Sequence, residues 1–356
     1  MRCTKCHDTL SLGKERVKLF FLSQIDELNH KSALLFEKLG YQPLSSDLVG
    51  IEVSSSECFF SENIDLLSSY FNELEREEIK VYEEAMDESS NIQKIIRAKP
   101  LSRYMNLISD REFFDIINHE SLTSHFQPII DAATNTIYGY ESLIRGVKED
   151  GSLMYPDELF GKSARNDLNF KLDRLARESA LKTAATKKVH QKIFINFIPT
   201  SIYDPEFCLA STVKWANQLE FDPKNIVFEV VETEHVKDQA HLKKILSYYR
   251  NEGFLIALDD VGEGYSSLNM LIELKPDIIK VDRKIICDIH KDPIKESVYR
   301  ALYNIAKENG IKILAEGVES AFEVAKIQEI GIDYLQGYYF ARPQPEPVRV
   351  ANSLWM

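Results

Sequence analysis

Six apolar, strand-like segments in the last two-thirds of the chain each carry a polar residue at or near the carboxyl end. They are KIFINF with Asn196, IVFEVVE with Glu229 and Glu232, FLIALDD with Asp259 and Asp260, DIIKVD with Lys280, IKILAE with Glu316, and YLQGYYF with Gln336. In a barrel of alternating strands and helices, the carboxyl ends of the strands meet at one rim. We therefore expect these side chains to face one cavity and to form an acidic site.

The oxygen atoms of these side chains are hard ligands, which suit Mg²⁺ or Mn²⁺. Glu141, Asn196, Glu229 and Asp259 could supply one cation, and Asp260 could extend the site to a second. On a regular strand Asp259 and Asp260 would point to opposite faces, but where the chain turns at a strand end both can reach one cavity. Adjacent carboxylates repel unless a cation neutralises them. A divalent metal site is the expected consequence.

Lys280 is the one basic residue of the set and lies in the otherwise apolar segment DIIKVD. A lysine in such a strand is seldom buried unless it is paired. Its charge could orient a water or a phosphate, or it could form an internal salt bridge with Asp277 or Asp282. A single carboxylate at the end of a strand is usually a solvated or capping group. Because such polar residues recur in successive strand units, we favour a functional role for the lysine and the neighbouring carboxylates.

The second part of the chain alternates helical with strand-like segments from about residue 110 onward. NFKLDRLARESALKTAATKK precedes KIFINF, AHLKKILSYYRNEG precedes FLIALDD, and KESVYRALYNIAKENG precedes IKILAE. Gly253 and Gly310 fall where a helix would close with a left-handed residue. Repeated units with nearly all-apolar strands predict an α/β fold with a parallel sheet that is buried on both faces.

The first part of the chain is predicted to be a small α/β module. Its elements are a strand in 16–23, an amphipathic helix in 25–41, a strand in 48–53 and a second amphipathic helix in 62–79. The charged segment 83–100 reads as an exposed boundary, with the domain junction near 95–110. We expect residues 1–100 to form a regulatory or dimerisation domain and residues 108–356 to form the barrel.

The charge balance excludes some classes of partner. The chain has 356 residues and a net charge of -13, which argues against binding duplex nucleic acid because clustered Lys and Arg would be needed. No apolar stretch approaches the length of a membrane helix, and the amino terminus lacks the apolar core of a signal peptide. The expectation is a cytoplasmic protein with no membrane partner, and five unpatterned cysteines fit a reducing compartment.

The amino terminus contains Cys3-Thr-Lys-Cys6-His7, which has the spacing of half a zinc site. Only the distant Cys58 could complete it. Zn²⁺ bound at Cys3 and Cys6 is therefore one interpretation, and two surface thiols without a metal is the simpler one. We favour the surface thiols. The same pattern would suit c-type haem attachment, but that requires export to an oxidising compartment.

Seven motifs in the second part resemble a known family in their order and spacing. They are YESLIRG at 140–146, INF at 195–197, FEVVE at 228–232, DDVGEGYSSL at 259–268, KVD at 280–282, AEGVES at 315–320 and QGYYFARP at 336–343. Together with FQPIID at 126–131 they resemble the EAL-domain phosphodiesterases of cyclic di-GMP over residues 108–350. The signature triplet is Glu-Ser-Leu in this chain.

The resemblance implies a TIM-type (β/α)8 barrel whose first strand is antiparallel to the others, and a homodimer formed through that barrel. It implies two Mg²⁺ or Mn²⁺ ions per active site, with Glu141, Asn196, Glu229 and Asp259 on the first and Asp260 on the second. Lys280 and Glu316 would handle the attacking water, and Glu232 would steady the mobile loop after the Asp pair. Substrate contacts would come from Gln127, Arg145, Glu319 and Gln336.

The implied reaction is hydrolysis of cyclic di-GMP to linear pGpG, in which two cations neutralise the phosphate and activate water. Val261 and Glu263 depart from the residues usual in the loop after the Asp pair, and Ile198 departs from the residue usual after Asn196. Two alternatives stay open. One is a silent cyclic di-GMP receptor or interaction module, and the other is an unrelated metal-dependent barrel hydrolase.

Overall fold

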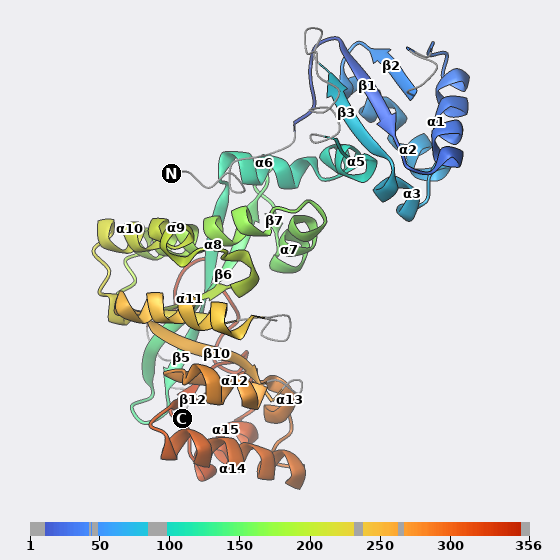
Figure 1. The fold of residues 1–356 in the computed structure, drawn as a ribbon. Coiled ribbons are helices and arrows are strands. Elements are labelled where there is room, and N and C mark those ends of the chain that lie inside the picture. The colour runs from blue at the N-terminus through green and yellow to red at the C-terminus, as the bar shows by residue number, and fades with distance from the viewer. Residues whose placement is uncertain are drawn as a thin grey trace. The chain divides into compact units, whose positions relative to one another are not determined.

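The computed structural model describes residues 11–42, 44, 49–84, 98–230, 238–262 and 267–349. The chain forms two compact units, which divide between Asn118 and His119 (Figure 1). Each unit has its own apolar core. The two units are therefore described separately.

The first unit is a four-stranded antiparallel sheet with helices. The strands β1 (Val17–Leu22), β2 (Val49–Val53), β3 (Lys80–Glu84) and β4 (Lys99–Pro100) lie in the order β2-β1-β3-β4. The helices are α1 (Asp26–Lys38), α2 (Ser56–Tyr70), α3 (Glu73–Glu78), α5 (Leu101–Ser109) and α6 (Arg111–His119). Apolar residues of the sheet, α1, α2 and α5 form the core of this unit.

Two details of this unit differ from the sequence prediction. The second predicted helix is split, because α2 ends before Phe71, whose backbone is extended, and Asn72 starts α3. Asn72 forms a capping box in which its side chain accepts from the Glu75 amide. The segment 80–84 is a strand that pairs with β1, so the first two residues of the predicted boundary 83–100 belong to the sheet, whereas 85–97 lie outside the described residues. Glu84 is buried in that strand, although a charged residue at this position indicates exposure when the sequence is considered alone.

The second unit contains a closed barrel, as predicted. Its strands are β5 (Leu122–Asp131), β6 (Thr136–Val147), β8 (Lys192–Phe197), β9 (Ile226–Val230), β10 (Leu255–Val261), β11 (Ile278–Val281), β12 (Lys312–Ala315) and β13 (Tyr334–Leu335). β5 pairs with β6 and with β13 antiparallel, whereas the other barrel pairs are parallel. The short strand β7 (Leu153–Met154) extends the sheet from β6. The prediction of a TIM-type barrel with one antiparallel strand is confirmed.

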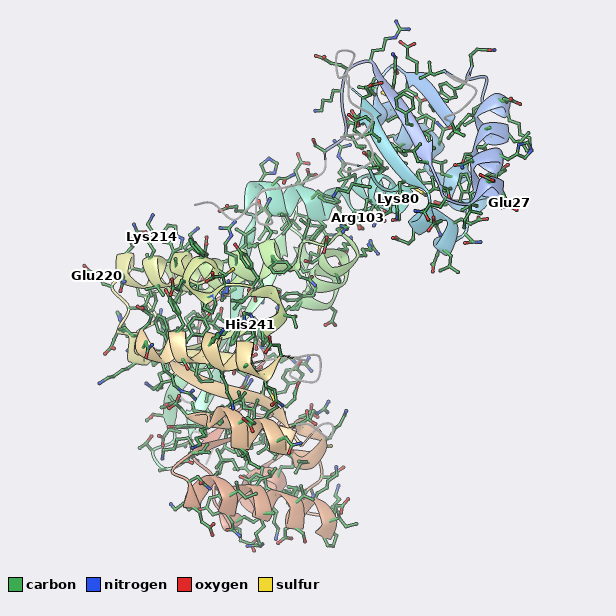
Figure 2. All side chains as sticks on the ribbon, viewed as in Figure 1. Glu27, Lys80, Arg103, Lys214, Glu220 and His241 are labelled. Atoms are coloured by element: carbon green, nitrogen blue, oxygen red, sulfur yellow. The ribbon has the colours of Figure 1, made fainter. Side chains whose placement is uncertain are left out.

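Helices lie outside the barrel, and α11 packs against β10 and α14 against β12 (Figure 1). The helices are α7 (Pro156–Arg165), α8 (Asn169–Thr186), α9 (Pro205–Cys208), α10 (Ala210–Gln218), α11 (Gln239–Asn251), α12 (Ser267–Leu274), α13 (Arg283–Ile286), α14 (Pro293–Glu308) and α15 (Ala321–Ile330). Gly253 and Gly310 follow α11 and α14 with φ of 88° and 69°, which confirms the predicted left-handed closures. Exposed charged residues such as Lys214 and Glu220 cover the outer surface (Figure 2).

The barrel interior contains one apolar layer to which seven strands contribute. Its members are Ile129, Phe194, Val227, Ala257, Ile278, Leu314 and Tyr334. Because side chains alternate along a strand, the residues two positions away face the same side. Those residues are Gln127, Asn196, Glu229, Asp259, Lys280, Glu316 and Gln336. The two-residue alternation that points the apolar side chains into the barrel therefore also points these polar side chains into it, at one end.

None of the helices in the described ranges is long and apolar enough to cross a membrane.

Candidate active site

Lys280 lies at the centre of the polar set and is almost fully buried, with 1% of its side chain exposed. Its Nζ lies 2.7 Å from Glu229 Oε1, 2.7 Å from Glu316 Oε1 and 3.0 Å from Asp259 Oδ1. Burial by itself would lower the pKa of Lys280, but the surrounding carboxylates, Asp259 foremost, raise it well above the ordinary value. The ammonium is therefore charged and held from three sides.

The alternative salt bridge of Lys280 with Asp277 or Asp282 is not found. Asp277 instead accepts a hydrogen bond from the Ile256 amide at 2.8 Å. Asp282 caps α13 by accepting from the Lys284 amide at 2.8 Å. Both aspartates have backbone roles, and the carboxylates of the rim pair with the lysine.

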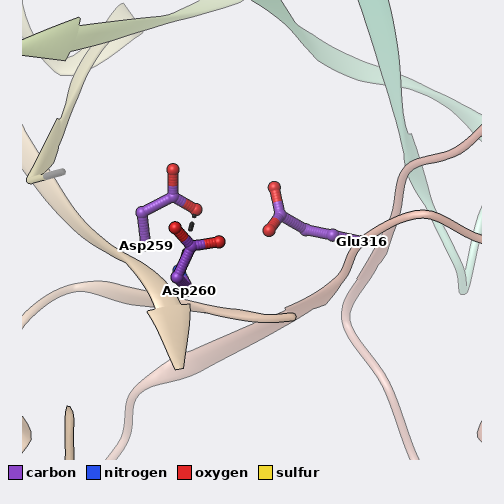
Figure 3. Close-up of side chains that lie close together, drawn as sticks. All are labelled: Asp259, Asp260 and Glu316. Carbon is purple, nitrogen blue, oxygen red and sulfur yellow. Dashed lines mark hydrogen bonds between the residues drawn. The ribbon is translucent and has the colours of Figure 1, made fainter. Parts of the chain in front are cut away.

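Asp259 and Asp260 face the same opening although they are consecutive (Figure 3). Asp260 adopts φ of 51°, and the pairing of β10 with β11 shifts register between Leu258 and Val261. This left-handed bend interrupts the strict alternation of the strand. As a result, carboxylate oxygens of Asp259, Asp260 and Glu316 lie within 4.8 Å of one another.

Glu141 is fixed by two amide side chains on the opposite part of the rim. Asn196 Nδ2 donates to Glu141 Oε1 at 2.9 Å, and Gln336 Nε2 donates to Glu141 Oε2 at 2.6 Å. Gln336 Nε2 also lies 3.1 Å from Gln127 Oε1. Burial would raise the pKa of Glu141, but the charge of Lys280 and these hydrogen bonds outweigh burial and lower it. The Glu141 carboxylate is thus ionised and oriented.

The rim carries more acid than base. Burial raises the pKa of Glu229 and of Glu316 well above the ordinary value, and the attraction of Lys280 offsets this only in part. Among the described residues, the carboxyl groups of Glu141, Glu229, Asp259 and Glu316 act on this one ammonium, and Asp260 lies beside Asp259 and Glu316. Additional positive charge at this rim would stabilise the ionised acids.

The side chains present fit a hard divalent cation. Asn196 Oδ1 and Gln336 Oε1 are buried and accept no hydrogen bond from the described residues. A buried carbonyl oxygen without a donor is costly, so an additional electropositive partner is expected there. The clustered carboxylates of Asp259, Asp260 and Glu316 add oxygen atoms of the type that Mg²⁺ and Mn²⁺ prefer.

Arg145 contributes a second buried cation near the rim, with 6% of the residue exposed. Its Nη1 donates to the backbone oxygen of Ile144 at 2.8 Å, and its guanidinium lies 5.0 Å from the centre of the Tyr155 ring. Within the described ranges we find no ion pair between Arg145 and a carboxylate, and its Nε has no acceptor. A buried guanidinium in this state is well suited to an anionic ligand.

Two cavities border the rim. The larger, of about 350 Å³, is bordered by Asn196 and Asp259 together with Ser142, Leu143 and Asp173. The smaller, of about 230 Å³, is bordered by Gln127, Glu141, Glu316, Glu319 and Gln336. The rim residues therefore border two open spaces in the described part of the chain, each large enough for a ligand larger than a water molecule.

The remaining predicted residues are placed less centrally. Glu319 lines the smaller cavity but is partly exposed, and it forms an ion pair of 2.8 Å with Arg283. Glu232 and Glu263 lie outside the described residues, as does the Cys3 and Cys6 pair.

Four residues near the site were not identified from the sequence. Tyr155 stacks on Arg145, and Arg283 pairs with Glu319. Asp173 of α8 accepts from the Ile198 amide at 2.9 Å, two residues after Asn196. Glu323 accepts from amides of the segment after β12. Their position in helices and loops hides them, because the strand pattern points only to residues on strands.

The fold and the rim together define an α/β barrel with a polar site at the carboxyl ends of its strands. Residues 110–343, more than half of the chain, match the EAL domain family. The chain therefore belongs to the EAL domain family, and the resemblance predicted from its motifs is confirmed.

Several known proteins are similar to this chain. The probable cyclic di-GMP phosphodiesterase PdeA of Escherichia coli is 28% identical over 58% of this chain and 29% of its own length. The probable cyclic di-GMP phosphodiesterase PdeG of the same organism is 29% identical over 68% of this chain and 49% of its own length. The chain thus spans less than half of these curated relatives.

Among solved structures, a standalone EAL protein from Vibrio cholerae O395 in a cyclic di-GMP bound form is similar to this chain. It is 36% identical, with a TM-score of 0.60, over 65% of this chain and 97% of that protein. The superposition covers nearly all of that standalone domain and extends over a part of this chain that is comparable with the family match.

Proposed function

We propose that this chain is a cyclic-guanylate-specific phosphodiesterase that hydrolyses cyclic di-GMP to linear pGpG. The observation that carries the proposal is the completeness of the rim around Lys280, where Glu229, Asp259 and Glu316 contact its ammonium. A member of the family that had lost hydrolysis would have no need to keep this buried and electrostatically costly cluster.

The relatives support the choice of substrate. PdeA and PdeG carry the name of cyclic di-GMP phosphodiesterases, and the Vibrio cholerae structure holds cyclic di-GMP. Two cavities of about 350 and 230 Å³, each bordered by rim residues, offer room for the two halves of a dinucleotide. We infer that the scissile phosphodiester lies between them.

In this proposal the rim holds two Mg²⁺ or Mn²⁺ ions. The first would be held by Glu141, Asn196, Glu229 and Asp259, and the second by Asp260. Such ions, when bound, neutralise the phosphate charge and lower the pKa of water. The hydrogen bonds that Glu141 accepts from Asn196 and Gln336 hold its carboxylate in one orientation.

The protein's own groups would then orient the reactants. The three donors of Lys280 contact Glu229, Asp259 and Glu316, so one of these carboxylates would have to turn to a cation before the ammonium could donate to the attacking water. Glu316 would share that water. Arg145 would hold a phosphate oxygen through its free donors, and Gln127, Gln336 and Glu319 would contact the substrate. Glu232 would steady the loop after the Asp pair, a role that falls outside the described residues.

The test is incubation of the purified chain with cyclic di-GMP and Mg²⁺ or Mn²⁺, with linear pGpG measured by chromatography. We expect pGpG to form and EDTA to stop its formation. Binding of cyclic di-GMP without any linear product would overturn the proposal and favour the silent receptor. Val261, at the start of the loop, is fully buried and pairs with Val281.

The family assignment sets aside the unrelated barrel hydrolase, and Glu141→Ala is the variant that checks this. We expect it to abolish product formation, since the Glu141 carboxylate joins Asn196 to Gln336. The exposed Glu346→Ala serves as the control.

For the rest of the chain, we propose a regulatory or dimerisation role for residues 1–100, homodimerisation through the barrel of residues 108–356, and a cytoplasmic location. A fragment of residues 105–356 with the turnover and the oligomeric state of the full chain would contradict the role of the first domain. Zinc analysis of the full chain, with and without replacement of Cys3 and Cys6, tests the amino-terminal site.

A further inference from the structure

Glu323 is a buried carboxylate next to the rim that none of the proposed roles uses. It lies in the first turn of α15 and is 4% exposed. Its Oε2 accepts hydrogen bonds from the amides of Glu319 at 2.8 Å and Ser320 at 3.0 Å. Its Oε1 accepts from the amide of Asp288 at 2.9 Å. Three backbone donors from two segments therefore end on one side chain.

The first of these segments connects β12 to α15 and carries two proposed site residues. Glu316 begins it and contacts Lys280, and Glu319 lines the smaller cavity. Gly317 within it adopts φ of 63°, and a Cβ there would lie 2.5 Å from the side chain of Arg283. The segment is thus packed closely against the residues that follow β11.

The second segment follows α13 and turns at Asp288, which has φ of 57°. It belongs to the connection that begins with Arg283, whose guanidinium pairs with Glu319 at 2.8 Å. That pair is exposed, with 56% and 43% of the side chains accessible, so it holds the segments together only weakly. The buried bonds of Glu323 are charge-assisted and hence stronger.

Helix capping accounts for only part of this arrangement. In the capping box of α15, Ser320 accepts from the Glu323 amide and Glu323 accepts from the Ser320 amide. The bonds from Glu319 and Asp288 lie outside that motif. They occupy both carboxylate oxygens, and a neutral amide side chain has only one acceptor oxygen.

We propose that Glu323 is a positioning residue that joins the segment after β12 to the turn at Asp288 and so holds Glu316 against Lys280. The inference rests on the proposed function, in which Glu316 belongs to the metal and water site. The carboxylate acts through the backbone of Glu319 and touches neither substrate nor the reacting atoms.

Glu323→Gln is the test variant, because glutamine keeps the shape but can accept from only one of the two segments. We expect Mn²⁺ binding, measured by calorimetry, to weaken about tenfold, the smaller of the losses that follow when outer support of a metal site is removed. Hydrogen exchange should be faster in a peptide that spans Asp288 or in one that spans Glu319 and Ser320. In turnover assays we expect a higher Mn²⁺ requirement and a lower kcat.

Ser320→Ala is the matched control. It removes the cap of the Glu323 amide, and so destabilises the same helix end, but it leaves the three bonds to the Glu323 carboxylate in place. We expect it to lower the melting temperature while Mn²⁺ affinity stays as in the unmodified chain. An equal loss of Mn²⁺ affinity in Ser320→Ala would overturn the proposal, because a general loss of stability would then explain both variants.

Glu323→Asp is measured alongside in case the glutamine variant does not fold. It keeps the charge but is too short to reach both segments, so the same changes are expected. Unaltered Mn²⁺ binding in either folded variant would overturn the proposal. If the unmodified chain neither binds Mn²⁺ nor forms pGpG, the proposed function fails, whereas unaltered hydrogen exchange in Glu323→Gln refutes the bridge itself.

Discussion

The ammonium of Lys280 lies 2.7 Å from a carboxylate oxygen of Glu229, although their strands β11 and β9 are separated in the sheet by β10. The contact therefore spans the intervening strand at the end of the barrel. Both side chains are buried, with 1% of Lys280 and 0% of Glu229 exposed. Such a pair is stable only if the lysine stays charged, and the neighbouring acids Asp259 and Glu316 ensure this.

Lys280→Met should nearly abolish hydrolysis, because it removes the donor that orients the attacking water. We expect kcat to fall by at least about 100-fold, the usual effect of losing a preorganised hydrogen-bond donor at the reacting centre. Formation of pGpG under saturating substrate measures it. Lys307→Met, at an exposed position of α14, is the control and should behave as the unmodified chain. Turnover of Lys280→Met close to that control would contradict the assignment.

Gly337→Ala should damage the site through the backbone. An added Cβ would lie 2.0 Å from the backbone oxygen of Val318 and 2.3 Å from its nitrogen, atoms that cannot move aside as a flexible side chain does. We expect a loss of about 1–3 kcal/mol of stability, as in overpacked cores, together with lower activity because Gln336 is adjacent. Urea unfolding and product formation measure the two effects.

Gly161→Ala is the matched comparison. Gly161 lies in α7, is exposed, and has open space where the Cβ would be. Here alanine should stabilise the chain by about 0.5–1 kcal/mol, since glycine is a poor helix former. The prediction is wrong if the two substitutions change the urea midpoint in the same direction.

Tyr155→Leu should weaken substrate binding. The Tyr155 ring lies over the guanidinium of Arg145, and its loss would free that side chain to leave the position in which it meets a phosphate. We expect KM to rise about two- to fivefold, which corresponds to a cation–π contact at a partly exposed site, while kcat changes little.

Tyr155→Phe keeps the ring and should leave KM as it is, and Tyr203→Leu controls for the loss of an exposed aromatic residue elsewhere. A higher KM in Tyr155→Phe would instead point to the hydroxyl group. An unchanged KM in Tyr155→Leu would show that Arg145 keeps its position without the ring.

Arg177→Met should destabilise the barrel in a manner that depends on pH. Arg177 and Asp173 are an ion pair of 3.1 Å with 1% and 2% of their side chains exposed. Removing the arginine leaves a buried carboxylate without its partner, a change that typically costs about 3–5 kcal/mol. Burial raises the pKa of Asp173 even beside Arg177, and without Arg177 it would rise further.

The sign of the pH effect follows from that raised pKa. Stability that comes from a raised acid pKa is present at low pH and is lost as the pH rises through the folded-state value. The loss in Arg177→Met should therefore grow as the pH rises over the range above about 3.9, the ordinary pKa of an aspartate, in urea unfolding. Arg300→Met, which breaks the exposed pair with Glu296, should show little loss at any pH. A loss in Arg177→Met that is constant over this range would contradict the prediction.

Much of the rim follows from local patterns. The spacing of two between Ile278 and Lys280, or between Val227 and Glu229, is a property of any strand that alternates its side chains. It predicts which residues share the interior, because a polar residue on that face can only be tolerated where the barrel opens. The left-handed closures at Gly253 and Gly310 are equally local.

The contacts themselves were not predictable in this way. Asp277 and Asp282 were as plausible as partners of Lys280 as Glu229 is, because distance along the chain says nothing about distance across a closed barrel. Helix periodicity has a similar limit. An acid and a base four residues apart form the same sequence pattern whether the pair is exposed to solvent or buried in a core. Asp173 and Arg177 belong to the core, and their burial follows only from the packing of α8 on the barrel.

The sequence by itself determined the kind of protein: the family, the barrel with its antiparallel first strand, and the polar residues at the strand ends. Only the tertiary structure decided which carboxylates hold Lys280, that a left-handed Asp260 directs consecutive acids to one opening, and that Glu323 joins two segments beneath Glu316. The reason is physical. Periodicity and capping depend on neighbours along the chain, whereas ion pairs and backbone bridges depend on barrel closure, which brings distant segments within a hydrogen bond of each other.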